Sequence, residues 1–145
     1  MAGYSQAPLA SKLGVRGDST LVLLGAPPAF SIELPPGAVL RRGSRGAADV
    51  IVSFHTRAAT LERSIAGLGR RVFPHGAVWI AWPKKASGVA TDLTDRVVRE
   101  AALAAGLVDN KVCAIDEVWS GLRLVWPREH RGSPRPSRSH RPGPE

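Results

Sequence analysis

The stretch DVIVSFHTRAATLERSIAGLGRRVFPHGAVWIAW, residues 49–82, decides the fold, because it contains a strand, a helix and a strand in succession. Residues 49–54 and 77–82 are continuous apolar runs of strand length, typical of strands that are buried on both faces. Between them, four apolar side chains recur at helical spacing along one stripe: Leu61, Ile65, Leu68 and Val72. Thr56 stands where a helix N-cap is expected. The unit therefore predicts two parallel strands joined by a crossover helix.

The alternation continues on both sides of this unit. Residues 20–25, TLVLLG, are another apolar run of strand length. A second helix is expected from about residue 95 to residue 105, capped by Thr94 and ended by Gly106. Five of its residues are candidates for burial: Val97, Val98, Ala101, Leu103 and Ala105. Residues 111–115 and 122–126 then predict an antiparallel pair of strands, joined by residues 116–121.

This order of elements predicts a small three-layer, Rossmann-like α/β sheet with parallel strands and an antiparallel C-terminal hairpin. Residues 26–46 interrupt the alternation, because four prolines there oppose a regular helix: Pro27, Pro28, Pro35 and Pro36. We expect at most one edge strand in this segment, around residues 38–41. The first crossover helix of the fold is therefore expected to be missing.

Several stretches resemble a known family. They are WIAWPKKASGVATDLT (79–94), GLVDNKVCAIDE (106–117) and the N-terminal GYS (3–5), PLA (8–10) and KLG (12–14). They are similar to the mainly actinobacterial family called domain of unknown function 3052, over roughly residues 3–126. The resemblance implies a bacterial, intracellular α/β domain and no assigned activity. The strand order also resembles the C-terminal half of class I methyltransferases, which implies an architecture and not a function.

Length and charge bound the organisation of the chain. With 145 residues, the chain is close to the size of one domain, which we assign to residues 1–126. Residues 127–145 carry no aliphatic or aromatic side chain, so we expect a disordered basic tail. The net charge is +8, but 16 of the 20 basic residues are arginine, a usage that a GC-rich genome produces whatever the function. The charge is therefore not evidence for nucleic-acid binding, and a weak nucleic-acid arm in the tail is the third interpretation.

Several other classes of protein are disfavoured. No apolar run reaches the roughly 18 residues that span a bilayer, and the N-terminus lacks the pattern of a secretory signal. The single cysteine, Cys113, cannot form an intramolecular disulfide and is expected to be a buried thiol. No metal-ligand spacing is present. We expect a cytoplasmic protein without a membrane segment, and its oligomeric state stays open.

The turn after residues 20–25 bears on cofactor binding. Nucleotide cofactors in such folds lie on a glycine-rich turn that leads into a helix, with an acidic residue after the next strand. Here a single glycine, Gly25, is followed by Pro27 and Pro28, and the next possible strand carries Arg41 and Arg42. The sequence therefore predicts no nicotinamide or S-adenosylmethionine site, and we expect no cofactor.

The loop after residue 82 is the best candidate for a binding site, because ligands in open α/β sheets gather beyond the carboxyl ends of the strands. Half of the four lysines lie there side by side, and hydroxyl groups and a glycine accompany them. The candidate ligand contacts are Trp82, Lys84, Lys85, Ser87, Gly88, Thr91 and Trp119. The preferred interpretation is a non-enzymatic or regulatory domain that binds a small anion or a partner protein there. A solvated loop, with Trp119 covering the end of the sheet, is the simpler alternative.

The second interpretation is an enzyme that acts on an anionic substrate. His55 follows a strand and is the only credible general base, although no recognisable motif pairs it with a Ser or Cys nucleophile. Asp92 and Asp116 are further candidates for acid or base, but positions at a helix start and in a turn explain them without catalysis. A loop histidine without a catalytic role is the alternative for His55.

Overall fold

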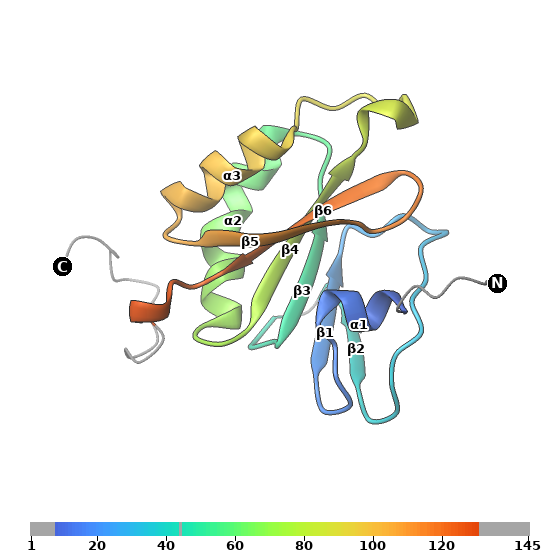
Figure 1. Ribbon diagram of the computed structural model, residues 1–145, viewed down its shortest axis with the longest axis vertical. Coiled ribbons are helices and arrows are strands. Elements are labelled where there is room, and N and C mark those ends of the chain that lie inside the picture. Colours follow the sequence, from blue (N-terminus) through green and yellow to red (C-terminus); the bar gives the residue numbers. More distant parts are fainter. Residues whose placement is uncertain (1–7, 44, 131–145) are drawn as a thin grey trace.

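The protein folds around one six-stranded sheet, seen in a computed structural model that describes residues 8–43 and 45–130 (Figure 1). The strands are β1 (Thr20–Leu24), β2 (Val39–Arg42), β3 (Val50–Phe54), β4 (Ala77–Pro83), β5 (Val108–Ala114) and β6 (Trp119–Val125). Their spatial order is β2-β1-β3-β4-β6-β5. Strands β1 to β4 run parallel, whereas β6 is antiparallel to both β4 and β5. The predicted α/β class with an antiparallel C-terminal hairpin is confirmed.

The sheet has a different cover on each face. Helices α2 (Ala58–Val72) and α3 (Asp95–Ala104) pack on one face, and the short helix α1 (Leu9–Leu13) lies on the other (Figure 1). Trp79 and Trp82, three apart on β4, enter the α1 core and the α2/α3 core respectively. They are 0% and 6% exposed, so both indoles fill the interior. A spacing of three residues puts side chains on opposite faces of a strand, as expected.

Helix α2 confirms the apolar stripe but not its predicted cap. All four stripe residues are buried. The helix begins at Ala58, and the extended backbone of Arg57 occupies the N-cap position, so the prediction that Thr56 caps the helix is wrong. The cap oxygen comes from elsewhere in the chain: the Ala58 N–H donates to Asp92 Oδ1 at 2.7 Å.

Helix α3 begins as predicted, since Thr94 Oγ1 accepts a hydrogen bond from the Val97 N–H at 3.2 Å. Gly106 follows the end of the helix with a φ of +89°, in the left-handed region. Val98 and Ala102 are the buried residues, one turn apart. The prediction that Leu103 is buried is wrong: its side chain is 58% exposed, because it lies on the far side of the helix from Val98.

The connection from β1 to β2, residues 25–38, contains no helix, in agreement with the prolines. Apolar side chains of this connection cover the α1 face of the sheet in place of a helix. Phe30 is 8% exposed, and its ring meets that of Phe54 edge to face with centroids 5.1 Å apart. Ile32 and Leu34 pack beside it. The predicted edge strand is present as β2.

The C-terminal hairpin is longer and tighter than predicted. Trp119 and Ser120 belong to β6 and not to a loop, because they pair with Pro83 and Trp82 of β4. Helix α1 was not predicted at all; the buried Trp79 Nε1 donates to the Leu13 carbonyl at 3.0 Å and holds this helix on the sheet.

The structure reaches into the predicted tail only at its beginning. The 3-10 turn η2 (Arg128–His130) is closed by a hydrogen bond from the His130 N–H to the Pro127 carbonyl at 2.9 Å. The rest of the predicted tail, residues 131–145, lies outside the described residues. Within residues 8–43 and 45–130, no helix is both long and apolar enough to cross a bilayer.

Candidate functional site at the carboxyl edge of the sheet

The carboxyl ends of the four parallel strands meet at one edge of the sheet, where open α/β folds bind ligands. The connection after β1 covers the α1 face, while β3 leads into α2 on the other face, so the topological switch point of the sheet lies between β1 and β3. Gly25 follows β1 with a φ of +70°, and a Cβ there would be 3.0 Å from the Phe54 carbonyl oxygen. Only glycine combines this backbone conformation with so close an approach. The ends of β1 and β3 are therefore in close contact at this switch point.

His55 follows β3 directly and is held on both sides by hydroxyl groups. Its Nε2 lies 2.8 Å from Ser53 Oγ, and its Nδ1 lies 3.1 Å from Thr60 Oγ1. The Thr60 hydroxyl uses its single hydrogen to donate a hydrogen bond to the Arg57 carbonyl at 2.9 Å, so it can only accept a hydrogen bond from Nδ1. This leaves Nε2 to accept from Ser53. The network therefore assigns the Nδ1–H tautomer to the resting ring.

Burial lowers the pKa of His55 below its ordinary value of 6.5, so the ring is neutral at pH 7. Ser53 is only 3% exposed, whereas the Thr60 side of the ring is open to solvent. Because a hydroxyl can donate or accept, Ser53 can satisfy Nε2 in either tautomer. Nδ1, on the exposed side, is then able to donate or to accept a proton when a bound molecule replaces Thr60.

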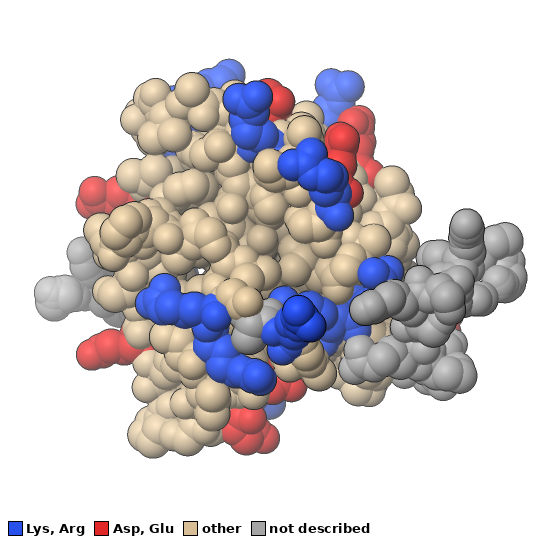
Figure 2. Space-filling view, turned by 180° about the vertical axis from the view of Figure 1, so that it is seen from behind, with Lys and Arg blue, Asp and Glu red and all other residues tan. Residues whose placement is uncertain are grey.

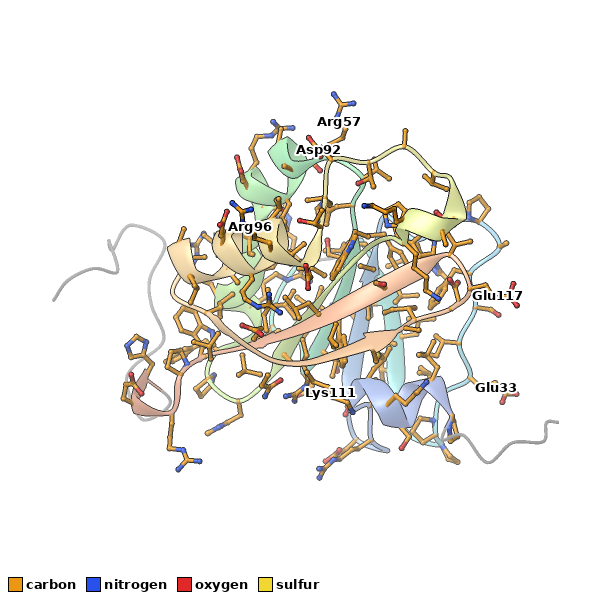
Figure 3. All side chains as sticks on the ribbon, turned by 45° about the horizontal axis from the view of Figure 1, so that its top comes forward. Glu33, Arg57, Asp92, Arg96, Lys111 and Glu117 are labelled. Carbon is orange, nitrogen blue, oxygen red and sulfur yellow. The ribbon has the colours of Figure 1, made fainter. Side chains whose placement is uncertain are left out.

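The loop between β4 and α3 is tied to the same edge. The Thr91 hydroxyl and the Asp92 N–H both donate to the Thr56 carbonyl, at 2.7 and 3.4 Å. Figure 3 shows Asp92 at the start of α2, beside Arg57, whose side chain points into solvent. The Asp92 carboxylate is already engaged by the Ala58 N–H. Its geometry is that of a cap, not of a free acid or base.

Asp116 is engaged in the same way. Its Oδ1 accepts hydrogen bonds from the Val118 and Trp119 N–H groups, both at 2.9 Å, and so shapes the turn between β5 and β6. Glu117, next to it, points outward from the tip of this hairpin, well away from Asp92 (Figure 3). Of the three candidates for acid or base, His55 alone has a chemical environment suited to proton transfer.

The predicted anion loop is short and internally bonded. It begins with the 3-10 turn η1 (Lys85–Ser87), and Ser87 Oγ donates to the Lys84 carbonyl at 2.7 Å and accepts from the Val89 N–H at 3.2 Å. Gly88 closes the turn with a φ of +78°. Ser87 and Gly88 therefore have structural roles in the loop. The ammonium groups of Lys84 and Lys85 have no ion-pair partner among the described residues.

The two aromatic candidates differ from the prediction. Trp82 is a core residue at 6% exposure, so it offers no surface to a ligand, because its strand is covered by α2 and α3. Trp119 is half-buried, with its ring edge to face on Phe54 at 5.1 Å. The Lys84 N–H donates to the Val118 carbonyl at 2.8 Å. The lysine loop and the Trp119 turn are therefore neighbours, as the combined site required.

Neither a metal ion nor S-adenosylmethionine fits the described residues. No group of three or more His, Cys, Asp or Glu side chains in residues 8–43 and 45–130 is arranged to hold a metal. A ribose is commonly held by a carboxylate after the second strand, but β2 ends in Arg41 and Arg42. Asp92, an acidic residue at the same edge, already accepts a hydrogen bond from the Ala58 N–H. We therefore derive no step through this cofactor.

Solved structures of methyltransferases share this arrangement of strands. A SAM-dependent methyltransferase from Aquifex aeolicus superposes with a TM-score of 0.62 at 10% identity, covering 80% of this chain and 86% of that chain. The fold is methyltransferase-like. Magnesium protoporphyrin IX methyltransferase from Synechocystis gives a TM-score of 0.53 at 9% identity, over 82% of this chain and 74% of that one. Fibrillarin in complex with Nop5p also gives 0.53, at 12% identity, over 77% and 74%. At these identities the comparison shows the fold alone.

No family model matches the sequence, and no curated protein matches it. The resemblance to domain of unknown function 3052 therefore stays an expectation, while the methyltransferase-like architecture is confirmed by the solved structures.

Sequence reasoning missed Ser53 as the partner of His55. The signal was present, because residues two apart on a strand share a face, and Ser53 is the polar residue in an otherwise apolar run. Thr60 follows five residues later in the first turn of α2. Its contact with His55 depends on how the chain turns through residues 56 and 57, which no local pattern encodes.

Proposed function

We propose that this protein is an enzyme that acts on a small anionic molecule at the carboxyl edge of its sheet, with His55 as the proton donor and acceptor. The observation that carries the proposal is the environment of His55. A neutral imidazole, held by a buried hydroxyl on one side and an exposed hydroxyl on the other, lies directly after β3, beside the topological switch point of the sheet. The methyltransferase-like fold of the solved neighbours supports an enzyme over a purely regulatory domain.

The anionic character of the substrate is inferred from the charged groups at the carboxyl edge of the sheet. Lys84 and Lys85 follow β4, whereas Asp92 and Asp116 already accept backbone hydrogen bonds. The free polar side-chain groups offered to a ligand at this edge are therefore the two ammonium groups, although Asp92 and Asp116 keep their charges. General acid–base catalysis by a positioned side chain contributes roughly 10²- to 10⁴-fold to a rate. We expect His55→Gln to lose about that factor, because glutamine can bond to Ser53 and Thr60 but cannot exchange a proton.

The test incubates the protein with a defined mixture of carboxylated and phosphorylated metabolites and follows each compound by mass spectrometry. We expect the wild type to convert at least one compound, His55→Gln to convert none, and the matched control His75→Gln, at an exposed turn residue, to match the wild type. Equal conversion by His55→Gln and the wild type would overturn the role of His55.

A binding domain without turnover is the second candidate, and the lysine loop favours it. In that case thermal stabilisation by an anion is lost in Lys84→Ala/Lys85→Ala, and no compound is converted by any variant. That pair of results would replace the enzyme proposal with the binding function.

A further inference from the structure

Strand β2 is an edge of the sheet, and two arginines lie at its end. Arg41 pairs with Val22 of the α2/α3 core, so its side chain lies on that face of the sheet. Arg42, the next residue along the strand, lies on the opposite face. Both side chains are exposed, and Val39 of the same strand is 50% exposed. Because the connection from β1 to β2 contains no helix, this end of the sheet stays open to solvent.

The chain after β2 joins these arginines to the end of α2. The Arg71 Nε atom donates to the Gly46 carbonyl at 2.7 Å, and the Ala48 N–H donates to the Arg71 carbonyl at 3.0 Å. The crossover from β2 to β3 is thus fastened to the last turn of α2. Arg45, which directly precedes Gly46, is exposed. Burial, and after it the charge of Arg41, lowers the pKa of Arg71, which agrees with the two guanidinium groups lying near each other.

Helix α2 extends the positive surface, because its charges are sorted by side. Arg63 and Arg70 are seven residues apart, which is about two turns, so they share the side of the helix that faces away from the sheet. Glu62 lies on another side, where it lines a groove against α3 together with Glu100. The exposed or half-buried arginines of this part of the molecule therefore form one arginine surface, made of Arg41, Arg42, Arg45, Arg63 and Arg70.

No carboxylate balances most of this surface. The three ion pairs in residues 8–43 and 45–130 all involve Arg96 or Arg99, on α3. Figure 2, which views the molecule from behind, shows lysine and arginine side chains gathered in a band across the lower half of this face. Like charges held this close repel one another, and a polyanion laid across them would relieve the repulsion.

The other side chains of the molecule indicate which polyanion fits. Every Phe and Trp side chain in the described residues is buried or half-buried, so the arginine surface has no aromatic platform on which unpaired bases could stack. Val39 is the sole large apolar side chain on β2 that is exposed, whereas a surface that binds membranes buries several apolar groups. Guanidinium groups donate hydrogen bonds and accept none, which suits phosphate oxygens better than the 2′-hydroxyl groups of duplex RNA.

We propose that the arginine surface binds the phosphate backbone of duplex DNA without sequence specificity. Guanidinium groups bond to phosphate in a bidentate manner, and duplex DNA presents one charge per about 1.7 Å of its axis. Five arginines on one surface can therefore contact several phosphates at once. The surface lies on β2, the β2–β3 crossover and α2, so it is distinct from the lysine loop and from His55.

The test measures binding of the full-length protein to a labelled DNA duplex of about two helical turns by fluorescence anisotropy, between about 50 and 200 mM salt. We expect equal affinity for two duplexes of unrelated sequence. Arg41→Gln/Arg42→Gln/Arg45→Gln should weaken binding at least about tenfold. It should also reduce the slope of log K against log salt by about 2 to 3, since each phosphate contact contributes about 0.9. An unchanged melting temperature of this variant verifies its fold.

The matched control is Arg57→Gln/Lys84→Gln/Lys85→Gln, which removes the same charge at the carboxyl edge of the sheet. It should bind DNA within about threefold of the wild type and with the same salt slope. Equal weakening by the two triple variants would overturn the proposal, because net charge alone would then explain binding. Since His55 and the lysine loop are intact in the β2 variant, loss of DNA binding there leaves the proposed enzyme function untouched.

A second background separates the arginine surface from the basic residues 131–145. Replacing the four arginines of this segment by glutamine should leave the effect of the β2 variant unchanged. Loss of binding on this replacement alone, with no effect of the β2 variant, would overturn the proposal. So would binding of single-stranded DNA or duplex RNA more tightly than duplex DNA. Binding to phosphatidylserine vesicles without any binding to DNA would likewise overturn it and make the surface a membrane contact.

Discussion

Replacement of Asp92 separates a structural from a catalytic role for this residue. Its Oδ1 accepts a hydrogen bond from the Ala58 N–H at 2.7 Å, so it supplies the capping oxygen for α2 although it is 34 residues away along the chain. Loss of a cap hydrogen bond costs about 1 kcal/mol, and loss of a negative charge at a helix N-terminus costs a further ~0.5 kcal/mol. We therefore expect Asp92→Ala to lower the free energy of unfolding by about 1.5 kcal/mol, measured by urea denaturation.

Asp92→Asn is the matched comparison, because it removes the same charge and keeps an oxygen acceptor. It should cost only about 0.5 kcal/mol, which is the contribution of the charge. Glu117→Ala, at the exposed tip of the β5–β6 hairpin, is the control for a change of net charge and should be near neutral. The capping argument fails if Asp92→Ala has the stability of the wild type, or if the Asn variant is as unstable as the Ala variant.

Three further predictions follow from single contacts. Because burial lowers the pKa of His55, the folded state binds fewer protons than the unfolded state in acid. The free energy of unfolding of the wild type should therefore fall relative to that of His55→Gln as the pH drops below about 6.5. Urea denaturation across pH 5–8 measures this, and parallel curves for the two proteins would contradict it. Gly37→Ala should destabilise by roughly 2 kcal/mol or more, since φ is +93° and a Cβ would overlap the Gly17 carbonyl oxygen; a change in melting temperature under 2 °C would refute it. Trp126→Phe should lower the free energy of unfolding by about 1–3 kcal/mol, because the buried indole N–H donates to the Gly69 carbonyl at 2.8 Å and phenylalanine has no such donor. An unchanged urea midpoint would show that the hydrogen bond is dispensable.

The fold was predictable because its determinants are local. The apolar runs of β1, β3 and β4 and the stripe of α2 are patterns within a few residues, and the prolines of residues 25–38 exclude a helix by themselves. The same patterns cannot say which side of a fully apolar strand is accessible. Trp82 was therefore predicted to contact the ligand, although its side chain lies in the core.

The candidate site was only partly predictable because its contacts join distant segments. The edge, His55 and the lysine loop follow from the general rule for open α/β sheets. The cap on Ala58 comes from Asp92, and the end of the Thr91 loop is fixed by the Thr56 carbonyl. These pairs are 34 and 35 residues apart in sequence, and their contact exists only after α2 and α3 have packed on the same face of the sheet.

The place of β6 in the sheet imposes an order on assembly. Among the strands that the structure describes, β6 is synthesised last, yet it lies between β4 and β5 and hydrogen-bonds to both. On the ribosome, β1 to β4 can therefore pair as they emerge, whereas β5 has no neighbour to join until residues 119–125 are free. A nascent chain halted before residue 119 would present β4 as an open sheet edge, with Trp79 and Trp82 on its two faces, which is a natural surface for a chaperone.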